Sequence, residues 1–183
     1  MIQIVKYDPK VIPKIIKFRA VAYQKLGRDP AQCELWSADE FDKDAIHIIK
    51  YHDSGSIIGA VRLIMDSEWT LEHYYQFPYD KQAGVEFGRL AALQKTFQGK
   101  RVVFELIESA CRYCRDRQKT YFYGFVINPL KRQLLWDRAP LQVLSPPLRP
   151  YGYPCYLVGF EIDAVLKYIN DGPPVHSPIP ANE

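Results

Sequence analysis

The stretch VEFGRLAAL, residues 85–93, decides the fold, because its composition predicts a central strand of a β-sheet. It carries two charged side chains, Glu86 and Arg89, with Gly88 between them. Strict alternation along a strand would place Glu86 and Arg89 on opposite faces of the sheet. A glycine inside a strand often marks a β-bulge, which shifts the phase by one residue. The sequence therefore predicts a bulge near Gly88 that brings both charges to one side.

Five segments precede this strand. Residues 2–7 suit a short first strand, and residues 11–27 repeat apolar side chains at the three- and four-residue spacing of a helix. Residues 28–44 show no period, contain a proline and several acids, and are expected to form a surface loop. The β-branched segments 45–51 and 57–64 are separated by HDSGS, which predicts a β-hairpin.

A helix and further strands are expected after the central strand. Residues 101–117 have the pattern of a helix and residues 119–127 that of a strand, so the three segments predict a βαβ unit. Asn128 at an N-cap and Pro129 behind it predict a helix over residues 128–139. Strands are also expected around LQVL and CYLVGFEI. The predicted fold class is α/β (α+β), a mixed central sheet flanked by helices.

The length of 183 residues, of which 48% are hydrophobic, predicts a single domain over residues 1–168. Residues 169–183 contain four prolines and no period, so they are expected to be extended or disordered. No apolar run is long enough to span a membrane, and the N-terminus MIQIVKYDPK lacks the apolar core of a secretory signal. We therefore expect a cytoplasmic protein without a membrane span.

The cysteines and histidines give no sign of a metal site. Cys111 and Cys114 form a CxxC, but both fall on the apolar stripe of a predicted helix, and no second pair completes a zinc site. The four histidines share no ligand spacing. We expect reduced thiols, packing roles for the CxxC, no bound metal and no permanently bound cofactor.

Several charged residues occur where burial is predicted. Moving an unpaired charge out of water costs several kcal/mol, so these residues are expected to form one ion-pair network. Such a network either shapes a polar pocket or simply holds the N-terminal helix and the acidic segment, which contains Asp39 and Asp42, against the sheet. Its expected members are Arg19, Asp39, Asp42, Arg62, Glu86 and Arg89.

The order and context of these residues resemble a known family. The pattern consists of Arg19, Trp36, the DEFD segment with Asp39 and Asp42, Arg62 within GAVRLI, and EFGR with Glu86 and Arg89. Over about residues 10–128 it resembles the acyl-homoserine-lactone synthases and their relatives, the N-acyl amino acid synthases. The resemblance implies a GNAT-like acyltransferase fold.

Some positions depart from the lactone synthases. Tyr23 stands where they usually carry phenylalanine, and Gly88 where serine is common. The segment DEFDKDAIH, with His47, is more similar to the amino acid synthases. The resemblance therefore implies transfer of a long-chain fatty acyl group from acyl carrier protein to the amine of an amino acid, such as tyrosine.

The resemblance also implies roles for individual residues. Glu86 is the candidate base for the attacking amine, and its apolar neighbours should raise its pKa while Arg62 or Arg89 lowers it. Arg19 and Arg62 are expected to orient either the acceptor's carboxylate or the acidic segment. Trp36 either packs over the acceptor or fills the core. The expected substrate-binding residues are Arg19, Tyr23, Trp36, Asp39, Asp42, Arg62 and Arg89.

An anionic partner is suggested by the ten Lys/Arg against four acids in residues 94–138. An acyl carrier protein is acidic, and the family resemblance implies that its acyl-phosphopantetheine arm lies between two strands separated by the bulge. Residues 94–101 are expected to lie between strand and helix, where the resemblance implies a glycine-rich turn whose backbone N–H groups bind phosphate. The expected carrier-binding residues are Lys95, Gly99, Lys100 and Arg101, with Arg112 and Arg115 on the same docking surface.

Two other functions remain open at this point. One is a lactone synthase that uses S-adenosylmethionine as the amine acceptor. The other is a non-catalytic GNAT-like binding module, in which the basic surface binds nucleic acid; the preferred interpretation includes no nucleic acid partner.

Overall fold

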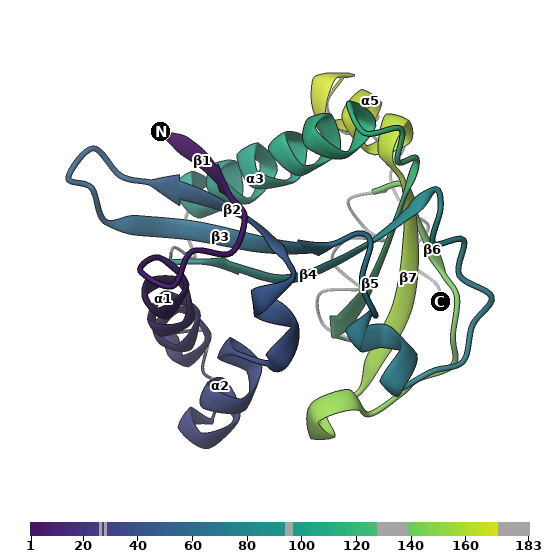
Figure 1. The fold of residues 1–183 in the computed structure, drawn as a ribbon, viewed down its shortest axis with the longest axis horizontal. Helices are drawn as coiled ribbons and strands as arrows, with labels where there is room; N and C mark the ends of the chain where they lie inside the picture. Colours follow the sequence, from purple (N-terminus) through teal and green to yellow (C-terminus); the bar gives the residue numbers. More distant parts are fainter. Residues whose placement is uncertain (26, 28, 94–96, 128–138, 172–183) are drawn as a thin grey trace, which may run out of the picture.

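The fold is built on one seven-stranded mixed sheet, seen in a computed structural model that describes residues 1–25, 27, 29–93, 97–127 and 139–171 (Figure 1). The strand order is β1-β2-β3-β4-β5-β7-β6. The strands are β1 (Ile2–Val5), β2 (Ile46–Tyr51), β3 (Ile57–Ile64), β4 (Gly84–Ala92), β5 (Tyr121–Ile127), β6 (Leu141–Val143) and β7 (Cys155–Glu161). Neighbouring strands are antiparallel except β4 and β5, which are parallel. The mixed α/β sheet expected from the sequence is confirmed.

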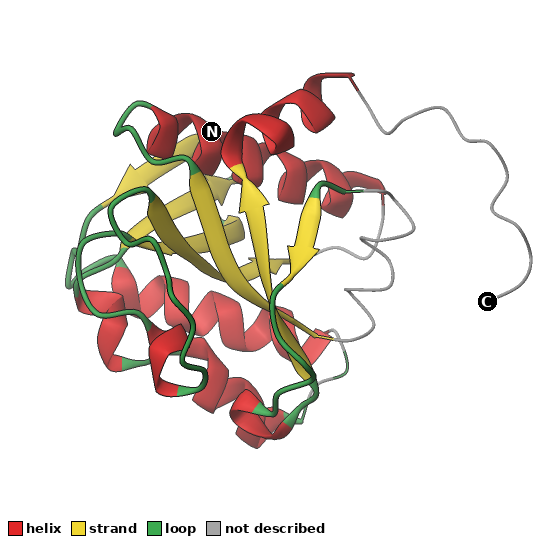
Figure 2. Cartoon of the chain, turned by 90° about the vertical axis from the view of Figure 1, so that its right-hand side faces the viewer, coloured by secondary structure: helices red, strands yellow, loops and turns green. Residues whose placement is uncertain are grey.

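Helices cover both faces of this sheet (Figure 2). They are α1 (Ile12–Lys25), α2 (Pro30–Ser37), α3 (Phe97–Arg115) and α5 (Ile162–Asp171), together with the 3₁₀ helices η1 (Glu40–Lys43), η2 (Thr70–His73) and η3 (Pro150–Gly152). Alternate residues of the strands face opposite layers: Ile49 packs with Ile15 of α1, whereas Ile48 packs with Leu106 of α3. This alternation places α1 and α3 on opposite sides of the sheet.

The predicted bulge is confirmed and lies just after Gly88. Ala60 of β3 pairs with Ala91 of β4, and Arg62 pairs with Gly88. Two residues of β4, Arg89 and Leu90, therefore lie opposite the single residue Val61, which is the definition of a β-bulge. Arg89 has a φ of 54°, in the left-handed region that side chains other than glycine rarely adopt.

Strands β4 and β5 pair over a short stretch only. Gly84 to Glu86 pair with Tyr121 to Tyr123 on one edge of β5, whereas the other edge of β5 pairs with β7 along its whole length (Figure 1). A side chain at Gly124 would meet the carbonyl of Phe87, so close contact with β4 extends to this glycine. The ladder between the two strands therefore ends directly after Glu86, and their close contact ends at Phe87 and Gly124.

Three expectations are corrected. The segment predicted as a loop over residues 28–44 forms α2 and η1, because Cys33 and Ser37 are buried and a helix of two turns is too short to show a period. Helix α3 begins at Phe97, four residues before the predicted start, so residues 97–101 lie in the helix and not in a connection. Helix α5 was missed, and it extends to Asp171, so Ile169 to Asp171 are helical rather than extended. The predicted helix over 128–139 lies outside the described residues, apart from residue 139.

Candidate active site

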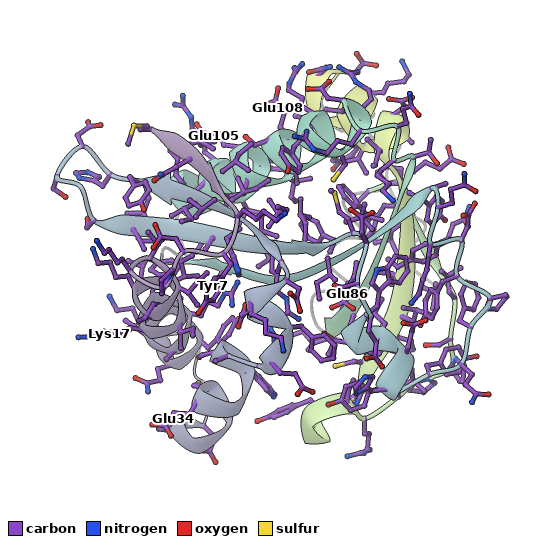
Figure 3. The ribbon with its side chains drawn as sticks, viewed as in Figure 1. Tyr7, Lys17, Glu34, Glu86, Glu105 and Glu108 are labelled. Atoms are coloured by element: carbon purple, nitrogen blue, oxygen red, sulfur yellow. The ribbon has the colours of Figure 1, made fainter. Side chains whose placement is uncertain are left out.

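Glu86 lies on β4 with 3% of its surface exposed, at the point where β4 separates from β5. Figure 3 shows it in the interior, whereas Glu34, Glu105 and Glu108 lie on the outside. Its Oε1 accepts from Arg62 Nη2 at 3.4 Å, and its Oε2 accepts from the Leu71 backbone N–H at 3.0 Å. Burial raises the pKa of Glu86 above its ordinary value, and the charge of Arg62 only partly opposes this effect. A carboxylate with a raised pKa is suited to accept a proton near neutral pH.

Arg62 connects Glu86 to the acidic segment. It pairs with Gly88 in the sheet while Ile64 pairs with Glu86, so Arg62 and Glu86 are diagonal neighbours on β3 and β4. Its Nη2 also donates to Thr70 Oγ1 at 2.9 Å, and its Nη1 donates to Asp39 Oδ1. The side chain is buried, and both of its terminal nitrogens donate hydrogen bonds to groups within the protein.

Arg89 reaches the same carboxylate from the bulge. Its Nη2 donates to Asp39 Oδ2 at 2.5 Å, and its Nη1 donates to the backbone carbonyl of Trp36. Asp39 thus accepts one guanidinium on each carboxylate oxygen. Burial alone would raise the pKa of Asp39, but Arg62 and Arg89 outweigh it and lower that pKa. The bulge therefore brings Glu86 and Arg89 into one network through Arg62 and Asp39, as the sequence predicted.

Asp42 fixes the acidic segment through both oxygens of its carboxylate. Its Oδ2 accepts from the backbone N–H of Asp39 at 3.2 Å, which completes a capping box at the start of η1. Its Oδ1 accepts from Arg19 Nη1 at 2.8 Å. Burial opposes the ionised form of Asp42, but Arg19 and Arg62 together lower its pKa. Arg19 is fully buried, and its bond to Asp42 holds the acidic segment in place.

His47 is a buried member of the network that the list of expected site residues did not contain. Its ring lies on β2 and contacts Arg19 and Asp42. Burial and the charge of Arg19 lower the pKa of His47 from 6.5 to about 4, so the ring is neutral near pH 7. Its signals in the sequence were a polar residue within the apolar strand segment IHIIKY and its place in DEFDKDAIH, which was used only to compare the two families.

We expect this lowered pKa to make folding acid-sensitive. Between pH 6.5 and 4 the unfolded chain protonates His47 and the folded chain does not, so the free energy of unfolding falls by about 3 kcal/mol as the pH drops through this window. Urea unfolding at several pH values measures this loss. The difference between the wild type and His47→Asn isolates it from the carboxylates, and parallel pH profiles for the two proteins would contradict it.

Tyr23 and Trp36 lie beside this network, half-buried, on α1 and α2. Their rings make an edge contact with centroids 6.4 Å apart, and burial raises the pKa of Tyr23. On its other side, Trp36 contacts Tyr153 at 5.0 Å, a residue that sequence reasoning did not identify. Tyr153 follows η3, so this contact joins the α1–α2 layer to the part of the sheet beyond β5. Thr70 and the Leu71 N–H were also missed, and a backbone donor such as the Leu71 N–H leaves no sequence signal.

The expected carrier-binding residues lie at or before the start of α3, and only some of them can be described. Lys95 lies outside the described residues, while Gly99, Lys100 and Arg101 lie in the first turns of α3. Arg101 is 77% exposed at its side chain and pairs with Glu105, and Arg112 pairs with Glu108. The basic side chains of α3 are thus partly neutralised by acids one turn away.

The described residues do not favour a metal site, a membrane-spanning helix or a reactive cysteine. They contain no group of three or more His, Cys, Asp or Glu that could hold a metal ion, and no helix among them is long and apolar enough to cross a membrane. Burial raises the pKa of both Cys111 and Cys114 to about 12, which suits packing rather than reactivity. A pocket of about 510 Å³ lies between Met65 and Lys119, and none of its lining residues belongs to the network.

The comparisons with known proteins identify the fold. No family model and no curated protein sequence matches the chain. Among solved structures, the AHL synthase LasI superposes with a TM-score of 0.70 at 15% identity, covering 98% of both chains. MesI, described as a CoA-dependent acyl-homoserine lactone synthase, gives a TM-score of 0.70 at 14% identity over 100% of both chains. A GNAT-family acetyltransferase from Staphylococcus aureus Mu50 gives 0.56 at 12% identity, covering 88% of this chain and 99% of that one. The chain therefore has the GNAT-like fold that acyl-homoserine lactone synthases share with acetyltransferases.

Proposed function

We propose that this chain is an N-acyltransferase that moves a long-chain fatty acyl group from acyl carrier protein to the amine of an amino acid. The observation that carries the proposal is the position of Glu86. A buried carboxylate with a raised pKa stands where the parallel strands separate, next to a bulge whose arginine is fixed by Asp39. The GNAT-like fold supports acyl transfer as the class of reaction.

The proposed reaction needs one base and one site for negative charge. The acceptor amine attacks the thioester carbonyl, a C–N bond forms, and the C–S bond breaks to release the carrier thiol. Glu86 accepts the proton that the amine loses, directly or through a water, and the departing thiolate takes up a proton. Backbone N–H groups after Arg89 are our candidates for holding the oxyanion.

The acceptor is proposed to bind against the half-buried members of the site. Arg19 and Asp42 are buried and bound to each other, so their role in this proposal is to hold the acidic segment. Asp39 keeps some exposure and a low pKa, so its carboxylate suits an ammonium group before the proton is removed. Tyr23 and Trp36 supply an aromatic wall beside it.

The donor is proposed to approach from the start of α3. Backbone N–H groups at the N-terminus of a helix favour anions, which suits the phosphate of a phosphopantetheine arm near Gly99. Lys95, Lys100 and Arg101, with the exposed Arg112 and Arg115, would attract an acidic carrier protein. Carrier proteins of fatty acid synthesis occur in the cytoplasm, so we place the reaction there, within the single domain predicted over residues 1–168.

The lactone synthase remains a second candidate because of the likeness to LasI and MesI. It differs in the acceptor, which would be S-adenosylmethionine, and because MesI is described as CoA-dependent, acyl-CoA is the donor to compare with acyl carrier protein. The departures at Tyr23, Gly88 and His47 favour the amino acid acceptor.

We expect the purified chain, given long-chain acyl carrier protein and a mixture of amino acids, to form an N-acyl amino acid. Mass spectrometry of the lipid extract identifies the product, and parallel reactions replace the donor by acyl-CoA or the acceptor by S-adenosylmethionine. Release of methylthioadenosine would instead identify a lactone synthase. Binding of nucleic acid that weakens steeply with salt, without consumption of any thioester, would identify a binding module.

A further inference from the structure

We infer that His47 is a positioning residue that places Asp39 for the reaction, through bonds from both nitrogens of its ring. The inference rests on the proposed function in its kinetic part only. His47 touches neither Glu86 nor Arg89 in any described contact, so it acts through Arg19 and Asp42.

The surroundings of the ring fix which nitrogen carries the proton. Arg19 Nη2 lies 3.1 Å from His47 Nδ1, and a guanidinium can only donate, so Nδ1 is the unprotonated acceptor. The hydrogen must then be on Nε2, which donates to the backbone carbonyl of Asp42 at 3.0 Å. One neutral ring therefore uses both nitrogens, one as acceptor and one as donor.

These two bonds hold Asp42 from two directions. His47 holds its backbone carbonyl, while Arg19, itself fixed by His47, donates to its carboxylate at 2.8 Å and to the carbonyl of Ser37 at 3.2 Å. The position of Asp42 is thus set at both its main chain and its side chain.

Asp42 in turn sets the position of Asp39. Its Oδ2 accepts from the Asp39 N–H, and the Asp39 carboxylate receives Arg62 and Arg89. A loose His47 would leave the end of α2 and η1 free to shift, and the carboxylate proposed to bind the acceptor amine would shift with them. Such a displacement would weaken the contact with the acceptor amine, so it should appear in the KM for the acceptor.

Three charged groups face the ring: Arg19 from α1, Asp42 from η1 and Arg62 from β3, which pairs directly with His47 in the sheet. The two arginines disfavour a protonated ring and Asp42 favours it, but burial and the arginines outweigh Asp42. A second hydrogen on the ring would point Nδ1–H at the guanidinium of Arg19. The inferred role therefore requires the neutral tautomer with hydrogen on Nε2.

Two amide variants separate the two ring nitrogens. In His47→Asn the amide oxygen can take the place of Nδ1 and accept from Arg19, but the Asp42 carbonyl loses its donor. In His47→Gln the amide can reach the place of Nε2, but Arg19 loses its acceptor. We expect the KM for the acceptor to rise about threefold in His47→Asn and about tenfold or more in His47→Gln, with the donor KM unchanged. His52→Gln is the matched control, because His52 is exposed and bonds to Ser54 in the β2–β3 turn.

Nitrogen-15 NMR of the histidine rings gives a readout that does not depend on turnover. We expect His47 to show an unprotonated Nδ1 and a protonated Nε2 between pH 5 and 8. A ring protonated at Nδ1, wild-type kinetics in both variants, or a fall in kcat with an unchanged acceptor KM would each overturn the inference. If no acceptor is acylated at all, the proposed function fails, while the tautomer still tests the geometry at Arg19 and Asp42.

Discussion

Glu86→Gln is expected to fold normally and to turn over about 10²- to 10⁴-fold more slowly than the wild type, which is the range that a positioned general base contributes. Glutamine keeps the size of the side chain, and its amide oxygen can still accept from the Leu71 N–H. It cannot take a proton from the acceptor amine. Because burial raises the pKa of Glu86, the wild type should also lose activity toward acid pH sooner than an ordinary glutamate would allow, and this limb should vanish in the variant.

The measurement is a steady-state assay of thiol release across pH, with saturating acceptor. Glu161→Gln is the control of matched chemistry, since Glu161 is exposed at the end of β7. Turnover of Glu86→Gln within a few-fold of the wild type would reject Glu86 as the base. Unfolding in urea at the wild-type midpoint ensures that a lost rate reports chemistry.

Asp39→Asn is expected to cause the largest loss of stability among the site variants, about 3–5 kcal/mol, because it breaks two largely buried ion pairs at once. Two guanidiniums, those of Arg62 and Arg89, converge on this one carboxylate. The asparagine amide would also point a donor at one of them. Activity should fall as well, because the variant removes the proposed contact to the acceptor amine.

Urea unfolding at pH 7 measures this loss, with Asp66→Asn as the control; Asp66 is exposed, so its variant should stay within about 0.5 kcal/mol of the wild type. The pH dependence has a defined sign. The pKa of Asp39 is lowered in the folded chain, so its contribution is present above the unfolded value of 3.8 and is lost as the pH falls below it. A variant as stable as the wild type at pH 7 would show that the ion pairs contribute nothing net.

The central part of the site could be predicted because charge in a core strand has few explanations. Glu86 and Arg89 on one apolar segment, with a glycine between them, required both a partner and a change of phase. The bulge opposite Val61 and the shared contact with Asp39 meet both requirements. The positions of the charged residues therefore predicted the candidate site, while the periodicity of the apolar residues predicted the sheet.

The parts that were missed depend on tertiary contacts with weak local signals. Helix α2 has two turns and is stabilised by packing, so no apolar repeat announced it. Helix α5 did show one, in Ile162, Val165 and Leu166, but it was obscured by the prolines that follow. The Leu71 N–H that donates to Glu86 is 15 residues away in sequence, and no pattern links a backbone N–H to a distant carboxylate. The early start of α3 likewise shows that Gly99 did not end the helix.

The left-handed backbone at Arg89 has a consequence for related chains. Any residue with a Cβ atom costs about 1–2 kcal/mol in this conformation, and glycine alone avoids that cost. Arginine is therefore the better residue only while Asp39 and the Trp36 carbonyl hold its guanidinium. A descendant that no longer needed the ion pairs would gain stability by changing this one codon to glycine. We therefore expect arginine at this position in related chains that retain the activity and glycine in those that have lost it. This exchange should appear before other signs of lost function.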